Sequence, residues 1–472
     1  MDSRFKYLIK NTSVLTIGSF SSKILVFLLV PLYTSILSTE EYGQYDLIAT
    51  TIQMLMPILA VSMYEGAMRF IMDKSKPNGQ VVSIGFRFAM FGIVIFTALV
   101  LLNRFFRFWE FAADFWLYII FYFTFSLLNQ YANQLARGFE QVRTIAISGV
   151  ISTIIVVGCN ILFLLVLKLG LKGFFLAYIL SYIVTGLYIF YKLKITTYFE
   201  KVTDTGLQRE MLSYSAPLIL NTIGWWANNS LDRYVVTWLC GVAVNGVFSV
   251  SYKIPSILNV LQGIFIQAWQ ISAIRETDSE DSAAFYGGIL DTINILMSFC
   301  CMVLIALTIP IAKLLFAKEF FYAWQYAPFL LLSCVINAAG GILGPVLSAR
   351  KDSKSMGLAA LYGALSNLIL NVLLVYFIGV QGAAIATAIS SFVIFQFRLK
   401  AVGKEGITIN YLKVVAPWVM MVVQSVLMIY TKMYYLQAIT ILLYCLIIRK
   451  DMKELLLKVK ILVFPGNKKG VK

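Results

Sequence analysis

The chain lacks histidine altogether, and it has few charged residues and few cysteines. Of its 472 residues, 13% are charged and 6 are cysteine. Without histidine there is no imidazole proton relay, so any proton coupling must use carboxylates such as Asp46, Glu65 or Asp232. The cysteines show no CxxC pattern and lie mostly in apolar runs, which favours packing over metal binding. We therefore expect no metal and no cofactor, while coupling to H+ or Na+ stays open.

Nucleotide-binding motifs and large external loops are missing as well. No P-loop or dinucleotide fingerprint is present, which argues against an intrinsic ATPase. The loops on the predicted external side are short, except for roughly Asn103 to Asp114. Membrane glycosyltransferases and polymerases usually need a substantial external loop for catalysis. The sequence thus disfavours an enzyme.

Apolar residues are abundant and make up 60% of the chain. Apolar runs recur along its whole length, each close to the roughly 20 residues that cross about 30 Å of hydrocarbon as a helix. We predict an all-α polytopic membrane protein whose first run is a span and not a removed signal peptide. About fourteen spans are predicted, near residues 13–38, 45–72, 83–103, 115–136, 144–167, 173–191, 212–239, 245–274, 288–312, 324–349, 356–378, 382–398, 412–431 and 433–448. The last two are separated only around Lys432, so twelve or thirteen spans stay open.

The 39 basic and 23 acidic residues give a net charge of +16, and the basic residues are unevenly distributed. Short cytoplasmic loops carry an excess of lysine and arginine, and most of the basic residues fall on the side of the N-terminus. The opposite side carries Arg104, Arg107, Lys168, Lys172, Lys313, Lys318 and Lys432. Both termini are therefore predicted to be cytoplasmic. The asymmetry accounts for most of the net charge, so we predict no nucleic-acid partner.

Similarity between the two halves indicates an internal repeat. Gly43 in EYGQYDL corresponds to Gly246 in VNGVFSV, since each opens a span after a tight external turn. A second set of matches has nearly the same offset and pairs Arg143, Asn160, Gly170 and Gly173 with Lys354, Asn371, Gly379 and Gly382. We predict two pseudo-symmetric six-helix lobes around a central cavity, an arrangement common among transporters. The predicted parts are a lobe at 1–200, a cytoplasmic linker at 201–211, a lobe at 212–398, two extra helices in 399–448 and a basic cytoplasmic tail at 449–472.

Several charged residues lie inside predicted spans, where a charge is costly and usually lines a cavity. Lys23 lies near the centre of the first span, and Asp232 and Arg233 are adjacent in the run Leu212 to Leu239. Arg233 and Lys253 lie at similar depth on neighbouring antiparallel helices, roughly 10 Å below the external turn. One hypothesis is that both converge on an anion. The alternative is that both side chains reach outward to the membrane surface, with Asp232 neutralising a neighbour.

Polar stripes accompany these charges along two predicted spans. Such stripes either hydrogen-bond neighbouring helices or line a wet cavity, and their length here favours a lining. We assign Trp225, Asn228, Asn229 and Gln267 to the cavity together with Lys23, Asp232, Arg233 and Lys253. Asp46, Glu65 and Arg69 are candidates for gating or coupling. Glu65 and Arg69 also have the i, i+4 spacing of a structural ion pair within one helix.

The chain resembles the polysaccharide biosynthesis flippases, the Wzx-type members of the multidrug/oligosaccharidyl-lipid/polysaccharide exporter superfamily, over nearly its full length. The segments that carry the resemblance are VPLYTSILSTEEYGQYDL, APLILNTIGWWANNSLDRYVVTWLCGVAVNGVFSVSYKIPSILNVLQGIFIQAW and SNLILNVLLVYFIGVQGAAIATAIS. The Asp-Arg pair and the Tyr-Lys-Ile-Pro run of the second segment are the most specific. By this resemblance Asp232, Arg233 and Lys253 are central-cavity charges, whereas Lys23 and Arg69 match the pattern less distinctively.

The resemblance implies a protein of the bacterial cytoplasmic (inner) membrane that moves undecaprenyl-pyrophosphate-linked oligosaccharide to the outer leaflet. Its partners would be the polyprenyl-pyrophosphate oligosaccharide, membrane lipids, and polysaccharide polymerase and export machinery. Two alternatives stay open: a drug or metabolite antiporter of the same fold, and a polysaccharide polymerase or ligase. The pathway, whether capsule, O-antigen, teichuronic acid or exopolysaccharide, is not specified by the sequence.

Overall fold

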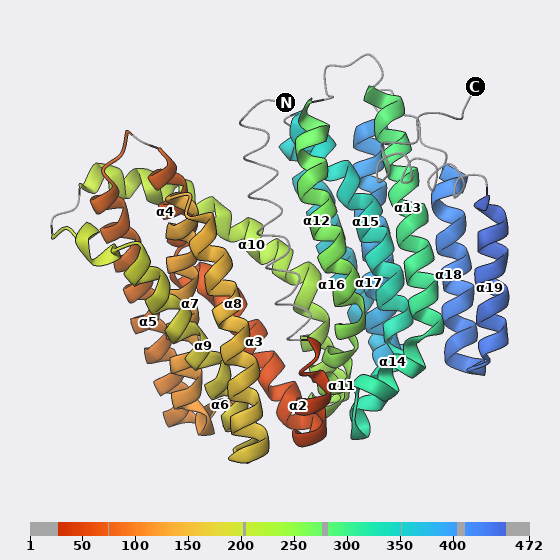
Figure 1. Cartoon of the computed structure of the whole chain (residues 1–472), viewed down its shortest axis with the longest axis horizontal. Helices are drawn as coiled ribbons and strands as arrows, with labels where there is room; N and C mark the ends of the chain where they lie inside the picture. Colours follow the sequence, from red (N-terminus) through yellow and green to blue (C-terminus); the bar gives the residue numbers. More distant parts are fainter. Residues whose placement is uncertain are drawn as a thin grey trace, which may run out of the picture. The chain divides into compact units, whose positions relative to one another are not determined.

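The apolar runs fold into helices, and every regular element that the structure describes is helical, as predicted. The computed structural model describes residues 27–73, 75–201, 204–275, 282–350, 352–403 and 411–449 (Figure 1). The chain divides into two compact units, which are considered separately below. Unit 1 comprises Met1–Ser249 and Leu315–Phe320, and unit 2 comprises Val250–Leu314 and Phe321–Lys472. The lobe boundaries predicted above were placed by the internal repeat. The division into two compact units does not test that repeat, so the boundaries stay a prediction.

Unit 1 is built from helices that follow one another along the chain. They are α2 (Val30–Ile36), α3 (Thr39–Leu59), α4 (Met63–Met72), α5 (Asn78–Phe106), α6 (Glu110–Asp114), α7 (Trp116–Gly138), α8 (Val142–Asn160), the π-helix η1 (Ile161–Val166), α9 (Gly170–Lys192), the 3-10 helix η2 (Ile195–Tyr198), α10 (Thr205–Cys240) and α11 (Val242–Ser251). In Figure 1 the long helix α10 crosses obliquely past α4 and continues to α11. This course brings α10 into contact with both α3 and α4.

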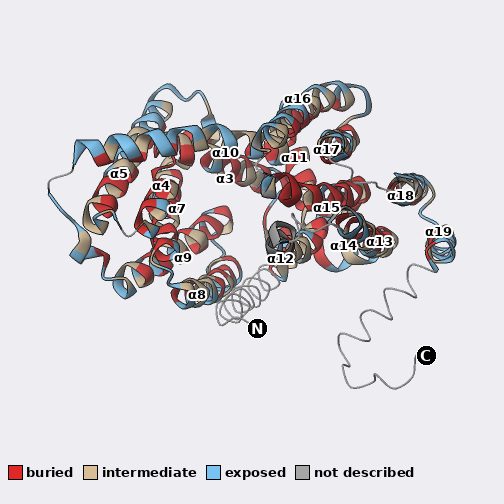
Figure 2. Cartoon of the chain, turned by 90° about the horizontal axis from the view of Figure 1, so that it is seen from above, coloured by how far each residue is buried: buried red, intermediate tan, exposed pale blue. Residues whose placement is uncertain are grey.

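The helices of unit 2 pack around one buried helix, α15 (Ala327–Ala349). Its other elements are α12 (Lys253–Arg275), α13 (Ser282–Ala306), α14 (Thr308–Leu315), η3 (Lys318–Gln325), α16 (Ser353–Ile378), α17 (Val380–Gly403), α18 (Tyr411–Thr431) and α19 (Tyr434–Ile447). Helix α15 packs against α12, α13, α16, α17 and α18. Figure 2 shows buried residues along α15, whereas α18 and α19 are largely exposed. A helix that is apolar on every side in this way belongs in the core of a bundle.

Eight described helices are long and apolar enough to cross a membrane, and α3 with α4 makes a ninth if the bent pair is one span. Helices α10 and α12 are also long, but they are not in this set. Most of the predicted span 13–38 lies outside the described residues. The all-α membrane fold is thus confirmed, whereas the count of fourteen stays a prediction.

The predicted span 45–72 is in fact broken. Helix α3 begins with a capping box, in which Ser38 and Glu41 bond reciprocally, and it ends at Leu59 shortly after Pro57. Val61 and Ser62 then adopt positive φ angles of 50° and 47°, a conformation that non-glycine residues rarely occupy. The next helix, α4, departs at 57° from α3. The predicted span 245–274 is also divided, because α11 ends at Ser251 and α12 begins at Lys253.

The two glycines matched by the repeat, Gly43 and Gly246, lie against each other in unit 1. A Cβ atom at Gly43 would collide with the carbonyl oxygen of Val242, and one at Gly246 would collide with that of Thr39. Helices α3 and α11 therefore cross with their backbones in contact, which only glycine permits. This crossing sets the register between Asp46, on the next turn of α3, and Ser249, on the next turn of α11.

The second set of matched residues forms the same hairpin in each unit. Gly170 and Gly379 both have positive φ angles, 54° and 66°, at the turn into α9 and α17 respectively. Three residues later, Gly173 packs closely on Phe163 of the preceding helix, and Gly382 packs closely on Leu374. The repeated glycines therefore serve the same tight helix–helix turn in both units.

The loop between α4 and α5 forms an ion pair with the start of α10 in unit 1. Lys76 Nζ lies 2.6 Å from Glu210 Oε2, and this hydrogen bond raises the pKa of Lys76. Asp73 accepts hydrogen bonds from the hydroxyl and backbone N–H of Ser75, which lower the pKa of Asp73. Both shifts favour the charged forms that the loop needs.

Candidate functional site

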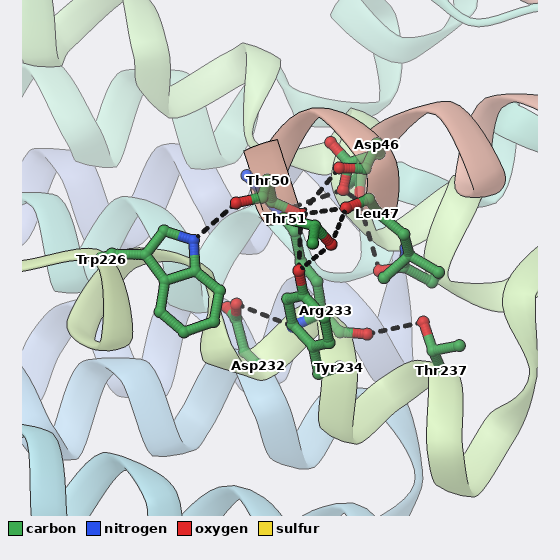
Figure 3. A network of polar contacts seen from close by, with 11 residues as sticks. Asp46, Leu47, Thr50, Thr51, Trp226, Asp232, Arg233, Tyr234 and Thr237 are labelled. Atoms are coloured by element: carbon green, nitrogen blue, oxygen red, sulfur yellow. Dashed lines mark hydrogen bonds and ion pairs between the residues drawn. The ribbon is translucent and has the colours of Figure 1, made fainter. Parts of the chain in front are cut away.

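A polar cluster joins α3 and α10 inside unit 1. Helix α10 contributes Trp226, Arg233 and Tyr234, whose side chains reach the turns of α3 that carry Asp46, Thr50 and Thr51 (Figure 3). Trp226 Nε1 donates to the Thr50 carbonyl oxygen at 2.9 Å. The hydroxyl groups of Tyr234 and Thr51 are 2.6 Å apart, and that of Thr51 donates to the Leu47 carbonyl at 2.6 Å. Tyr234 is therefore the donor to Thr51.

The charged centre of this cluster is an ion pair between Arg233 and Asp46. Arg233 Nε lies 3.4 Å from Asp46 Oδ2, and the two side chains are 16% and 14% exposed. The Ser249 hydroxyl donates to the same Asp46 oxygen at 2.6 Å. Asp46 is thus held from α10 and α11 at once. Such partial burial makes the loss of one partner costly, because the remaining charge stays poorly solvated.

Asp232 has a different environment from its neighbour. Its side chain is 3% exposed, and its Oδ1 accepts from the backbone N–H of Arg233 at 2.9 Å. Figure 3 shows this contact beside the Arg233–Asp46 pair. One alternative that the sequence left open was that Asp232 neutralises a neighbouring cation. The structure pairs the guanidinium of Arg233 with Asp46, which the sequence had suggested for gating or coupling.

The remaining predicted cavity residues of α10 differ in exposure and in hydrogen-bond partners. Trp225 is 65% exposed, whereas the adjacent Trp226 is 8% exposed. Asn228 donates to the Gly224 carbonyl at 3.0 Å, and Asn229 donates to that of Trp225 at 2.7 Å. Both amides therefore bond the preceding turn of their own helix.

Three other predicted positions are not tested by these contacts. Lys253 begins α12 in unit 2, so its convergence with Arg233 on one anion stays a prediction. Gln267 belongs to α12, but its side chain is outside the described residues, and Lys23 lies outside them entirely.

Glu65 and Arg69 do not form the intrahelical ion pair that their spacing suggested. Glu65 Oε1 accepts a hydrogen bond of 2.6 Å from Gln134 of α7. Ion pairs among the described residues include Lys76–Glu210, Arg104–Asp114, Arg107–Asp114 and Arg233–Asp46, and none of these contains Glu65 or Arg69. The break before α4 turns Glu65 towards α7, and tertiary packing overrides the local spacing.

Sequence reasoning missed the roles of Ser249, Tyr234 and Thr51 in this cluster. A usable signal was present, because the glycine match identified Gly43 and Gly246 as equivalent span openings. Treated as a crossing point, that match would have placed Asp46 and Ser249 one turn beyond the contact, facing each other. A hydroxyl and a carboxylate at that position predict the observed hydrogen bond.

The cluster combines a permanently charged donor with an acceptor that can be replaced. Guanidinium presents five N–H donors and can bind the oxygens of a carboxylate or of a phosphate in a bidentate way. An anion that approaches Arg233 would therefore compete with Asp46 for the same donors. Two further contacts join α3 to its neighbours: Ser249 of α11 bonds Asp46, and Tyr234 of α10 bonds Thr51.

Comparisons with known proteins identify the family and the fold. The sequence matches the family described as polysaccharide biosynthesis protein over residues 8–270, which is more than half of the chain. An uncharacterized membrane protein of Methanocaldococcus jannaschii is 25% identical over 258 residues, which are 51% of this chain and 60% of that protein. The match thus spans less than two thirds of that relative's length.

Two solved structures share the fold over most of the chain. The lipid II flippase MurJ in an inward closed conformation has a TM-score of 0.69 and 18% identity, with 94% of this chain and 99% of that chain covered. An inward-facing multidrug resistance MATE family transporter of the MOP superfamily has a TM-score of 0.66 and 15% identity, with 82% and 98% covered. The matched region 8–270 includes both Asp46 and Arg233, and the chain therefore belongs to the polysaccharide biosynthesis protein family, with the fold of MOP superfamily transporters.

Proposed function

We propose that the chain is a flippase that moves undecaprenyl-pyrophosphate-linked oligosaccharide repeat units across the bacterial cytoplasmic membrane. Its support is the family, the fold shared with a lipid II flippase, and the polar cluster on α10. The pyrophosphate of such a substrate cannot cross hydrocarbon unaided, and a cation at membrane depth offsets the cost of its desolvation. The sugars need hydrogen-bonding partners, whereas the polyprenyl tail stays in lipid.

The observation that carries this proposal is the Arg233–Asp46 ion pair. The Arg233 guanidinium pairs with Asp46 of α3 inside unit 1, and this carboxylate also accepts a hydrogen bond from Ser249. An incoming pyrophosphate bears more negative charge than one carboxylate and is the stronger partner for a guanidinium. In this mechanism Arg233 and Lys253 bind the pyrophosphate. The ion pair between Arg233 and Asp46 forms again when the substrate leaves.

The proposal has further parts that follow from the predicted topology. Both termini are cytoplasmic, and two lobes rock to expose the bound headgroup alternately to the two sides. Transport is coupled to H+ or Na+, with Asp46, Glu65 and Arg69 as the candidate residues. The expected partners are membrane lipids and the polymerase and export machinery of a surface polysaccharide such as capsule, O-antigen or exopolysaccharide.

The test is outward movement of a polyprenyl-pyrophosphate oligosaccharide in liposomes that contain the purified protein. Movement is measured as accessibility to an external sugar-binding probe. We expect the wild type to exceed protein-free vesicles, and the double variant Arg233→Gln, Lys253→Gln to lose most of the movement. Arg104→Gln is the matched control, because Arg104 is an exposed partner of Asp114. Normal outward movement of the oligosaccharide in a double variant that inserts at normal levels would rule out a pyrophosphate site at Arg233 and Lys253.

A drug or metabolite antiporter is the second candidate, favoured by the fold shared with a multidrug transporter and by the carboxylate at the cluster. It predicts ion-driven uptake of cationic drugs that depends on Asp46 and no movement of the lipid-linked sugar. A deletion strain separates the flippase from a polymerase. Loss of a polymerase leaves single repeat units exposed outside, whereas loss of a flippase retains them inside.

A further inference from the structure

A short segment of the chain belongs to unit 1 although the residues on both sides of it belong to unit 2. This segment is Leu315–Phe320, which we call the latch. Both of its boundaries fall inside regular elements, because α14 runs into it as far as Leu315 and η3 runs out of it from Lys318. Phe316 and Ala317 lie between these two elements. The latch therefore meets unit 2 through helical backbone at both boundaries, and a motion of α14 and η3 is transmitted to it.

Thr34 of α2 binds the backbone of the latch through its hydroxyl group. This hydroxyl accepts a hydrogen bond from the Ala317 N–H at 3.2 Å, and it lies 3.2 Å from the Leu315 carbonyl oxygen. Thr34 has a single O–H, and the Val30 carbonyl oxygen of its own helix is nearer, at 2.8 Å. The O–H can therefore bond within α2 when the latch leaves. Separation at this contact is thus reversible, because Thr34 keeps a partner in either state.

Two side chains of the latch make further contacts inside unit 1. Glu319 Oε2 accepts a hydrogen bond from the Thr39 hydroxyl at 3.2 Å. Phe320 is 1% exposed, and its ring lies edge-on to that of Tyr42, with the centroids 5.8 Å apart. Hydrogen bonds to hydroxyl groups and a single ring contact are each weak in net terms. Together they can hold the latch in one state of a transport cycle and release it in another.

We propose that the latch closes the external side of the transporter and must leave its site on unit 1 before the substrate is released outwards. Lys313 and Lys318, which precede and belong to the latch, are among the basic residues predicted on the external side. The inference rests on the proposed function, because a rocking mechanism moves α14 and η3 relative to unit 1. Their continuous backbone then carries the latch with them. Thr34, Thr39 and Tyr42 determine how long the external side stays closed.

Cross-linking the latch to unit 1 tests this role in liposomes that contain the purified full chain without its six native cysteines. Thr39→Cys and Glu319→Cys are joined by a short bifunctional methanethiosulfonate reagent, whose bridge is removed by reduction. We expect outward movement of the lipid-linked oligosaccharide to fall to the level of protein-free vesicles, and reduction to restore it. The matched control joins Glu40→Cys to Gln44→Cys on adjacent turns of α3 and should leave movement unchanged. Normal movement with a fully cross-linked latch, or an equal loss in the control pair, overturns the proposal.

A second measurement separates the latch from the proposed function. Thr34 is buried against the latch, so a membrane-impermeant maleimide should react with Thr34→Cys only when the latch is released. Phe320→Ala removes the ring contact with Tyr42 and should raise the rate of this labelling at least about tenfold. Labelling of Ser35→Cys, an exposed neighbour, should not change. If no variant moves the oligosaccharide, the flippase proposal fails, while faster labelling of Thr34→Cys still supports the latch. Unchanged labelling of Thr34→Cys in Phe320→Ala overturns the latch.

Discussion

At the residue scale, Asp46 is the internal competitor of any anion that binds Arg233. Asp46→Asn removes the carboxylate charge 3.4 Å from Arg233 Nε while keeping a side chain of the same size. We expect a pyrophosphate-bearing lipid to bind about tenfold more tightly, since removing one charged competitor is worth of the order of 1.4 kcal/mol. Release should slow, so outward movement should fall although binding improves.

Binding and movement are measured separately in this experiment, on the same protein preparation. Ser249→Ala is the matched control, because it removes the 2.6 Å hydrogen bond to Asp46 but leaves its charge. It should change affinity far less than Asp46→Asn. Weaker lipid binding in Asp46→Asn would contradict the competition and would assign Asp46 to substrate binding.

Tyr234 tests whether the cluster stabilises the contact between α3 and α10. Tyr234→Phe removes the 2.6 Å hydrogen bond to Thr51 and leaves the ring contact with Trp226. We expect a loss of about 1 kcal/mol of stability, which should be visible as a lower thermal unfolding midpoint. Tyr430→Phe is the control, since Tyr430 is 81% exposed. Equal midpoints for the two variants would show that the bond does not contribute to stability.

Sequence reasoning at this scale identified the charges but not their pairing. The cost of an intramembrane charge was enough to single out Asp232 and Arg233. Asp46 is the partner because α3 crosses α10 and α11. The sequence pattern of one helix does not predict how it crosses another helix. The Glu65–Arg69 pair failed for the same reason, because Gln134 of another helix offers Glu65 a better partner.

At the element scale, the crossing of α3 and α11 positions the cluster. Gly246→Ala places a Cβ against the Thr39 carbonyl and must push the two helices apart. We expect a loss of about 1–3 kcal/mol from overpacking, together with loss of the Asp46–Ser249 hydrogen bond and of transport. Unfolding midpoint and transport are measured alongside Gly224→Ala, a helical glycine with nothing within 4 Å of its Cβ position. Similar defects in both variants would argue against a special role for the crossing.

Asn294 of α13 bonds the α18 backbone beside a proline, in addition to the hydrogen bond that Gln424 of α18 donates to the Met302 carbonyl of α13 at 3.0 Å. Pro417 lacks an N–H, so the Lys413 carbonyl one turn earlier loses its helical donor. The Asn294 amide lies 3.5 Å from that oxygen and 3.1 Å from the Val414 oxygen, and its own oxygen accepts from Trp418 at 2.9 Å. Asn294→Leu should therefore cost about 1–3 kcal/mol by leaving buried polar groups unsatisfied.

The Asn294 prediction is checked by thermal unfolding of the purified protein. Thr292→Val on the same helix is the control, because the Thr292 hydroxyl is exposed and bonds only the Gly288 carbonyl of its own helix in the contacts described. If both variants unfold at the wild-type midpoint, the Asn294 hydrogen bonds do not contribute to holding α18.

Helix positions were largely predictable because apolar length is a strong signal. The predicted spans 356–378 and 382–398 correspond to α16 and α17, and 324–349 corresponds to α15. The breaks after Leu59 and Ser251 were not predicted, because each lies within a long apolar run, although Pro57 and Pro255 stand close to them. Backbone conformation at Val61 and Ser62 depends on the packing of α4, which hydrophobic patterning does not encode.

At the scale of the whole molecule, the charges predict which ends of the helices face the cytoplasm. In unit 1, Ser75 and Phe108 lie beyond opposite ends of α5, a helix of 29 residues that spans roughly 43 Å. Basic residues such as Lys76, Arg143 and Lys192 accumulate at the Ser75 end. In unit 2, Lys354 and Lys432 lie at the start of α16 and between α18 and α19. The positive-inside rule therefore predicts Ser75 and Lys354 on the cytoplasmic side, and Phe108 and Lys432 outside.

Labelling single cysteines in a background without the six native ones tests this arrangement. All four positions are exposed, so accessibility reports the side of the membrane and not burial. We expect a membrane-impermeant maleimide to label Phe108→Cys and Lys432→Cys in intact cells, and to label Ser75→Cys and Lys354→Cys only after permeabilisation. Complete reversal would place both termini outside and would invert the proposed direction of transport. A pattern that reverses in unit 2 alone would mean an odd number of crossings between the units, which would remove the parallel repeat on which the two-lobe transport mechanism depends.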